Sequence, residues 1–294
     1  MSDPLVNVIG RLPETGETLE VAPGVLWLRM PLPFALDHIN LWVLEDGDGW
    51  TLVDTGINRE QTMDAWEMLF AGPLAGRPVR RLIVTHFHPD HMGLAGWLTE
   101  KFGVEMWATE TEWQTASTLY YDEHSKELID KARTFYLAAG FGPALMAKVE
   151  ALGNPYPARV SPIPKSYRQI AEGDVIDIGG RGWRVMIGTG HSPEHACLYC
   201  GEAGVLISGD QILPKITPNV SVWPQRAVQD PLKLFLGSLK TFAPLPEDTL
   251  TLPSHNWPFL GLRQRLEIMA HHHDERLDDV VRACAEPHKG VDVL

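Results

Sequence analysis

Four side chains that can bind a metal fall within six residues of one short segment. This segment, residues 85–91, follows an apolar run and contains His86, His88, Asp90 and His91. Neutral imidazole and carboxylate are ligands that borderline divalent metals prefer. The spacing predicts that His86 and His88 reach one ion while Asp90 and His91, just after a turn, reach a second ion beside it. A polar loop that caps the following helix is the alternative, but it accounts poorly for four ligand types at this spacing.

Three more segments supply one candidate ligand each, directly after predicted strands and next to Gly or Pro. They contain His191, Asp210 and His255. Glycine lets the backbone approach closely, and loops at strand ends commonly carry functional residues. We predict two metal sites, with Asp210 as the ligand that bridges them. The predicted ligands are His86, His88 and His191 for the first site, and Asp90, His91 and His255 for the second.

Such a dinuclear site predicts hydrolysis. A divalent metal lowers the pKa of bound water toward about 7, and two metals about 3.5–4 Å apart would share the hydroxide and polarise a carbonyl. Asp90 would orient this nucleophile and carry a proton to the leaving group. The expected cofactors are two divalent ions, zinc in the first place, with iron or manganese as alternatives. No Ser-His-Asp or Cys nucleophile motif and no Gly-rich phosphate loop competes with this interpretation.

The elements that must position these ligands are strands in two groups, separated by helices. Apolar runs with turn residues between them predict the strands, and longer periodic patterns predict the helices. The predicted strands cover residues 25–30, 39–44, 50–54, 81–85, 183–187, 196–200, 205–208 and 250–252. The predicted helices cover residues 59–70, 91–102, 110–152, 231–242 and 260–285. This order favours an α/β sandwich with helices outside over one continuous parallel sheet.

Composition limits the classes of partner. The chain has 294 residues, with 25 Lys+Arg against 38 Asp+Glu, and therefore a net charge of −13. This acidic balance argues against binding to nucleic acid or to an anionic membrane. No apolar run is long enough to span a membrane, and the first residues do not resemble a signal peptide. Three cysteines do not form a disulfide framework. We expect a cytoplasmic protein with a small-molecule substrate, and a homodimer stays open.

Together these motifs resemble the metallo-β-lactamase superfamily, in the family's motif order, over roughly residues 25–276. The resemblance includes Leu52-Val-Asp-Thr-Gly56, whose Asp54 is similar to the family aspartate that lies beneath the metal ligands. It implies an αββα sandwich with the site at one edge of the two sheets. We accordingly expect a catalytic domain over residues 1–262 with a helical insertion at about 110–155. A C-terminal helical segment would follow over residues 263–294, where the helical tail of many relatives is either missing or shortened.

Details within the motifs indicate which branch of the family the chain resembles most. The β-lactamases proper have Cys or Ser where Asp210 stands, and flavodiiron proteins have Glu where His88 stands. RNA-processing members share all seven ligands but are mostly more basic. The chain is therefore most similar to glyoxalase II-like and lactonase-like hydrolases, which implies cleavage of a small thioester or lactone. The alternatives are a mononuclear iron persulfide dioxygenase, a phosphodiesterase or nuclease, and a non-catalytic or nucleic-acid-binding member.

Other residues are candidates for contacts around the metals. We predict substrate contacts for His38 and, on the loop after Asp210, for Asn219, Trp223 and Arg226. Asn40 is a further candidate for the pocket wall. His195 either supports the site or is an ordinary strand histidine, and both interpretations stay open. Aromatic residues of the insertion could form a lid, although core packing is the default for each: Trp113, Tyr120, Tyr121, Tyr136, Tyr156 and Tyr167.

Overall fold

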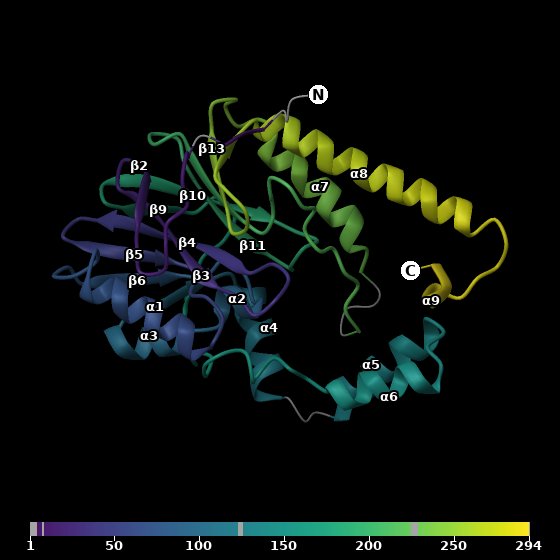
Figure 1. Cartoon of the computed structure of the whole chain (residues 1–294). Helices are drawn as coiled ribbons and strands as arrows, with labels where there is room; N and C mark the ends of the chain where they lie inside the picture. Colours follow the sequence, from purple (N-terminus) through teal and green to yellow (C-terminus); the bar gives the residue numbers. More distant parts are fainter. Residues whose placement is uncertain (1–4, 8, 123–125, 225–228, 294) are drawn as a thin grey trace.

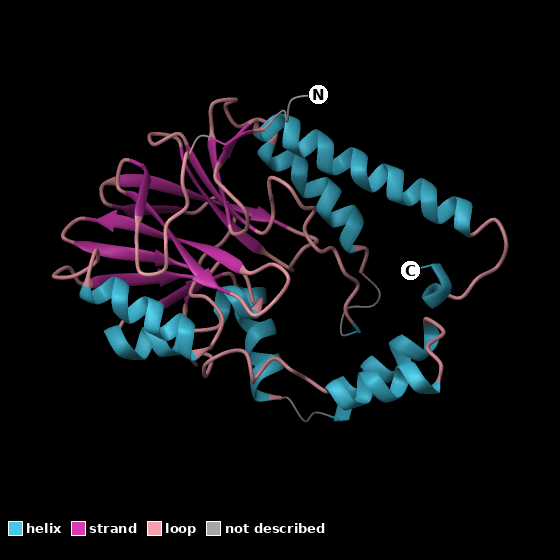
Figure 2. Ribbon diagram, viewed as in Figure 1, coloured by secondary structure: helices cyan, strands magenta, loops and turns pink. Residues whose placement is uncertain are grey.

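Two seven-stranded sheets pack face to face and carry helices on their outer sides (Figures 1 and 2). The structure is a computed structural model that describes residues 5–7, 9–122, 126–224 and 229–293. The arrangement confirms the predicted αββα sandwich, with its helical insertion and its C-terminal helix.

The first sheet contains the N-terminal group of strands. Its strands are antiparallel up to β5 and parallel from β5 onward. Its order is β2 (Leu19–Ala22), β3 (Val25–Pro31), β4 (His38–Asp46), β5 (Gly49–Val53), β6 (Val79–Ile83), β7 (Met106–Ala108) and β8 (Arg168–Gln169).

The second sheet is built mainly from the C-terminal group of strands. Only β12 and β13 pair in parallel among its described strands. Its order is β1 (Val6–Asn7), β14 (Phe259–Leu260), β13 (Leu250–Pro253), β12 (Val205–Gly209), β11 (His195–Cys200), β10 (Arg181–Gly188) and β9 (Val175–Ile178).

Strand alternation divides the core into layers. Along β4, Trp42 faces the second sheet and meets the cluster around Trp183, whereas Leu41 faces the outer helices. Successive side chains of a strand point to opposite faces, so one strand serves two layers. Burial of each such large apolar side chain contributes about 1.5–3 kcal/mol. The two sheets therefore share a continuous apolar interior, which fixes the position of one sheet relative to the other.

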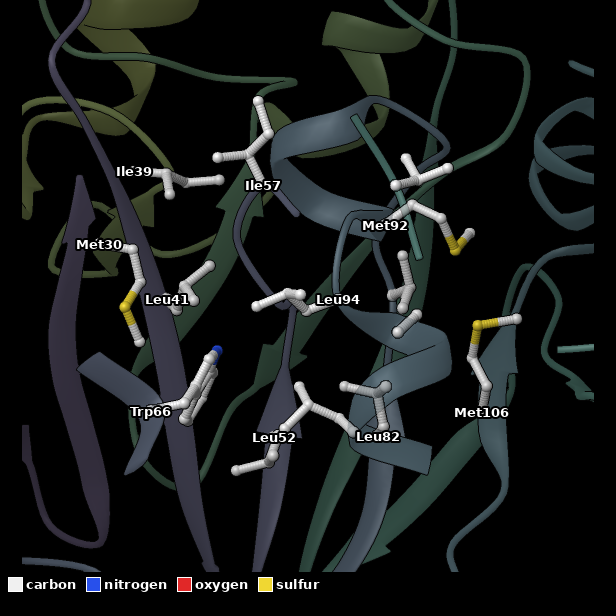
Figure 3. Packing of buried hydrophobic residues seen from close by; sticks show 14 of the residues in the cluster. Met30, Ile39, Leu41, Leu52, Ile57, Trp66, Leu82, Met92, Leu94 and Met106 are labelled. Atoms are coloured by element: carbon white, nitrogen blue, oxygen red, sulfur yellow. The ribbon is translucent and has the colours of Figure 1, made fainter. Parts of the chain in front are cut away.

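Helices close both outer faces. On the first sheet, α1 (Glu60–Ala71) and α3 (Ala95–Phe102) add Trp66 and Leu98 to a cluster that Figure 3 shows from close by. On the second sheet, α7 (Pro231–Phe242) and α8 (Leu262–Ala283) contribute Phe235, Phe242 and Met269. Beyond Met269, α8 extends away from the sandwich (Figure 1).

The insertion comprises α4 (Glu110–Tyr121), α5 (Lys126–Ala138) and α6 (Pro143–Leu152). Helix α4 packs beside the sheets, whereas α5 and α6 lie apart from them near the C-terminal α9 (Gly290–Val293) (Figure 1). The backbone N–H of Val291 donates to the carbonyl of Ala139 over 2.9 Å, so the chain end contacts the insertion. No helix in the described part of the chain is long and apolar enough to cross a membrane.

The helix predicted from His91 to Phe102 is instead two helices, α2 (Pro89–Met92) and α3. The N–H of Leu94 donates to the Thr55 hydroxyl over 2.9 Å rather than continuing the helical pattern. A Cβ on Gly93 would lie 2.3 Å from the carbonyl oxygen of Gly56, so only glycine allows this approach. The break packs the short α2 against the loop after β5, and α2 carries two of the predicted ligands.

Candidate metal centre

All seven predicted ligands meet at one edge of the sandwich. The loop after β6 and the short α2 carry the first four, from His86 to His91. His191 lies between β10 and β11, Asp210 directly follows β12, and His255 follows β13. Since β12 and β13 run in parallel, their carboxyl ends deliver two ligands to the same edge.

The first site brings its three histidines together. The Nε2 atom of His86 lies 2.9 Å from Nδ1 of His88 and 3.1 Å from Nε2 of His191. An oxygen of Asp210 joins them, 3.5 Å from Nε2 of His191. Three ring nitrogens and one carboxylate oxygen thus lie within 4.8 Å of one another.

Asp210 lies between this site and the second one. Its other oxygen, Oδ1, is 3.3 Å from Nε2 of His255 and 3.5 Å from Nε2 of His91. Asp90 completes the second site, with Oδ2 3.5 Å from Nε2 of His255 and 3.8 Å from Nε2 of His91. One carboxylate contacts ligands of both sites, which is the geometry required of a bridging ligand.

In three of the candidate ligand histidines, Nδ1 faces away from the site and donates a hydrogen bond to an oxygen atom. His91 donates from Nδ1 to Asp54 over 2.8 Å. His191 donates to the carbonyl of Asn219 over 2.8 Å, and His255 donates to the carbonyl of His38 over 2.9 Å. Such contacts set the tautomer and orientation of metal-binding histidines. Each of these rings therefore presents Nε2 to the site.

The two sites differ in electrostatics. Burial lowers the pKa of His88 to about 3 and also holds the pKa values of His86 and His191 below their usual range. These imidazoles are neutral, which is the form that binds metal. Burial alone would lower the pKa of His255, but the carboxylates of Asp210 and Asp90 outweigh burial and raise this pKa to about 10. The same carboxylates supply negative charge that a bound cation would balance.

Two observations show that a metal fits these residues. Bonds of about 2.0–2.1 Å from zinc leave tetrahedral ligand nitrogens about 3.3 Å apart, close to the 2.9 and 3.1 Å separations in the first site. In the second site, Nε2 of His91 and Oδ1 of Asp210 are buried without a hydrogen-bond partner in the described part of the chain. Buried polar atoms normally have a partner. A divalent cation is the partner that suits both a lone-pair nitrogen and a carboxylate oxygen.

His195 supports the site, which resolves the two interpretations left open by the sequence. Its Nε2 accepts a hydrogen bond of 3.0 Å from the backbone N–H of Asp210. Its ring lies 4.7 Å from that of His86 and is fully buried. The left-handed backbone of Gly209, with φ +53°, brings the chain so close that a Cβ would lie 2.3 Å from His195. Glycine is therefore required for Asp210 to reach its position.

The predicted substrate contacts fall in different places. Both ring nitrogens of His38 are engaged within the protein: Nδ1 with Asp37 at 2.7 Å, and Nε2 as acceptor from the N–H of Asn256 at 3.1 Å. Asn40 is buried, and its amide donates to the carbonyls of Pro253 and Asn256. These two side chains hold the loop that carries His255. Arg226 lies outside the described residues.

Asn219 and Trp223 lie on the loop that borders the first site. Asn219 acts through its backbone carbonyl, the acceptor of His191, while its exposed side chain accepts from the Ser221 hydroxyl. The ring of Trp223 is 6.3 Å from that of His88 and 6.1 Å from that of Phe87. Because Trp223 is 41% exposed, it offers an apolar surface next to the metal ligands.

Of the six aromatic residues predicted as a possible lid, Tyr156 is buried, Tyr121 is exposed and the other four are partly buried. Trp113 stacks on Tyr167 with 4.5 Å between centroids, and its indole N–H donates to the carbonyl of Pro164. The Tyr121 hydroxyl donates to the carbonyl of Ile163. Tyr156 is buried and donates to the carbonyl of Phe87 over 2.6 Å. These contacts fasten the insertion to the sandwich.

Asp54 lies beneath the second site, and its contacts lead to a testable prediction about metal binding. Its carboxylate accepts from His91 Nδ1 and from both the N–H and the hydroxyl of Thr85. The left-handed backbone at φ 64° suits Asn as well as Asp, so Asp54→Asn should keep the fold. We expect metal affinity of the second site to fall about 10–100-fold, measured by chelator competition. Asp46→Asn, at another buried carboxylate, should leave metal affinity unchanged; an equal loss there would contradict the assignment.

The sandwich and the paired histidine and aspartate clusters at its edge define the class of metallo-hydrolases. Residues 35–255 match the family model described as the metallo-beta-lactamase superfamily, and the chain belongs to this family. A relative in Bacillus subtilis (strain 168), "Probable metallo-hydrolase YqjP", is 26% identical over 266 residues, covering 89% of this chain and 81% of that protein.

Two solved structures share the whole architecture. A beta-lactamase domain protein from Burkholderia ambifaria is 43% identical, with a TM-score of 0.87, and the match covers 98% of this chain and 87% of that one. A metallo-beta-lactamase family protein from Thermus thermophilus is 29% identical, with a TM-score of 0.80 over 93% of this chain and 87% of that one. These likenesses confirm the family and the fold that the motifs predicted.

Proposed function

We propose that the protein is a dinuclear-metal hydrolase in which hydroxide attacks the carbonyl of a small thioester or lactone and the acyl C–S or C–O bond is cleaved. The observation that carries this proposal is the position of Asp210, whose two oxygens face ligands of different sites. A bridging carboxylate suits two adjacent ions rather than one. Two such ions would lower the pKa of bound water toward about 7 and would polarise a substrate carbonyl.

Asp90 is the side chain best suited to move the proton in this reaction. Its side chain is 19% exposed, compared with 10% for Asp210, 4% for His255 and none for His91. It is therefore the second-site ligand most accessible to water and substrate. Its carboxylate would orient the attacking water, accept the proton and pass it to the leaving sulfur or oxygen.

The substrate class follows from the surroundings of the two sites. Asp210 stands where the β-lactamases proper carry Cys or Ser, which disfavours antibiotic hydrolysis. The exposed Trp223 lies beside His88 and near the buried Phe87, and its indole would suit the hydrocarbon part of an acyl group. The net charge of −13 disfavours nucleic-acid substrates.

Metal analysis and a substrate panel test the proposal. Purified protein should contain about two divalent ions per chain, and it should lose activity on chelation and regain it with zinc or manganese. Glutathione thioesters, acyl-CoAs, lactones and phosphodiesters should then be compared with the metal-replete protein. Preference for thioesters or lactones supports the proposal. One iron per chain with oxygen uptake on a thiol persulfide, or preference for phosphodiesters, would overturn it.

Trp223 supplies a prediction about substrate binding. If the indole binds the non-reacting part of the substrate equally in the ground and transition states, Trp223→Ala should raise KM about 5- to 10-fold and leave kcat within about twofold. Steady-state kinetics on the best substrate of the panel would measure this. Met68→Ala, at an exposed apolar residue of α1, is the matched control and should change neither constant. An unchanged KM for Trp223→Ala would exclude its contact with substrate.

A further inference from the structure

A glutamate of the insertion is buried between the loops that carry the first metal site. Glu112 lies in the first turn of α4 and has no exposed surface. Acidic residues are almost never buried completely unless their oxygens are satisfied. The groups that donate hydrogen bonds to this carboxylate therefore indicate its role.

One carboxylate oxygen binds the backbone between two metal ligands. Oε2 of Glu112 accepts from the N–H of Phe87 over 2.9 Å. Phe87 separates His86 from His88, so this bond holds the peptide that spaces their rings. On the other side of Phe87, the hydroxyl of Tyr156 donates to its carbonyl over 2.6 Å. The segment between the two histidines is thus held from both sides by residues of the insertion and its end.

The other carboxylate oxygen binds the loop of the third ligand. Oε1 of Glu112 accepts from the Ser192 hydroxyl over 2.7 Å and from the N–H of Glu194 over 2.7 Å. Ser192 directly follows His191, which completes the first site. One buried carboxylate therefore joins the loop of His86 and His88 to the loop of His191.

We propose that Glu112 is a positioning residue that sets the separation of the first-site histidines and thereby the metal affinity of that site. This inference rests on the proposed metal-binding function of the cluster, and it gives the helical insertion a part in building the site. The second-site ligands are held by other groups. Asp54 contacts His91, while His38 and Asn40 hold the segment that carries His255.

Two acceptor oxygens at Glu112, and not only the size of its side chain, are required by this arrangement. An ionised carboxylate accepts at both oxygens, and the three groups above all donate. Glu112→Gln keeps the shape but replaces one oxygen with an amide that donates. One of the hydrogen bonds then becomes a contact between two donors, which a buried site tolerates poorly. In either orientation of the amide, one of the two loops that carry first-site histidines loses its hydrogen bond to residue 112.

The experiment measures metal affinity of the first site alone. In a His255→Ala background, which weakens the second site, cobalt or zinc binding is titrated against a chelator. Glu112→Gln should weaken binding about 10–100-fold, and should change the visible absorption bands of bound cobalt. Tyr156→Phe, which removes one hydroxyl from the Phe87 carbonyl, should weaken binding to a smaller extent.

The matched control is Glu110→Gln, the same substitution on the same helix. The exposed Glu110 accepts a hydrogen bond from the Gln114 side chain over 3.0 Å and lies outside the bonds that join the two ligand loops. This variant should keep the metal affinity and the cobalt spectrum of the parent. An equal loss in Glu110→Gln, or none in Glu112→Gln, would overturn the inference.

Two further measurements separate the possible failures. If the parent protein itself binds no metal, the proposed function fails, whereas normal binding in both parent and Glu112→Gln contradicts this inference alone. If Glu112→Gln does not fold, Ser192→Ala and Tyr156→Phe carry the test, since each removes one bond on a different loop. Both should then lower first-site affinity by a few fold, and unchanged affinity in both would overturn the inference.

Discussion

Asp210→Ala should remove nearly all turnover, by about 10³-fold or more, together with most binding of the second ion. The reason is geometric: its two oxygens face Nε2 of His191 and Nε2 of His255 at 3.5 and 3.3 Å, so both sites lose a ligand at once. The fold should persist, because the surrounding backbone is held by other bonds, including that from its own N–H to His195. Metal content and kcat measured on the same preparation would check both effects.

The control for this prediction is Glu202→Ala, at an exposed acidic residue in the turn that precedes β12. It changes the net charge by the same amount and should leave activity and metal content unaltered. A circular dichroism spectrum matching the parent would establish that the Asp210 variant is folded. Near-normal turnover with both ions retained in Asp210→Ala would exclude Asp210 as the bridging ligand.

Asp90→Asn should lower kcat about 10²–10⁴-fold, which is the usual cost of losing a positioned proton-transfer group. The amide keeps the size and one oxygen ligand but can no longer take up a proton. The loss should fall on kcat rather than KM, since the group matters most as charge develops in the transition state. The first-site ion should stay, because His86, His88 and His191 are unchanged.

Matched metal content is essential for the Asp90 measurement, since weaker binding at the second site would imitate a chemical defect. The parent and the variant should therefore be compared with two ions bound per chain. Glu100→Gln, the same loss of a carboxylate charge at an exposed position of α3, should have no effect. Equal turnover of Asp90→Asn and the parent under these conditions would show that Asp90 has no part in the chemistry.

The candidate ligands could be named from the sequence because their signals are local. His86 to His91 lie within six residues, and the remaining three ligands each follow an apolar strand beside Gly or Pro. Strand and helix patterns depend on short periodicities, so most elements of both sheets and helix α7 were predicted within a few residues. Six of the described strands were not predicted, namely β1, β2, β7, β8, β9 and β14. Each spans only two to four residues, which is too short to show a clear alternating pattern.

The sequence by itself determined the chemical class of this protein, because ligand type and spacing carry that information whatever surrounds them. Only the tertiary structure decided which side chains support the ligands. Glu112 resembles any helix glutamate until folding brings it between Phe87 and Ser192, 25 and 80 residues away. His38, whose contact with substrate stays a prediction, also holds the backbone beside His255, 217 residues away. Such contacts join distant segments, and the physical reason they cannot be predicted locally is that burial and hydrogen-bond partners are properties of the packed chain.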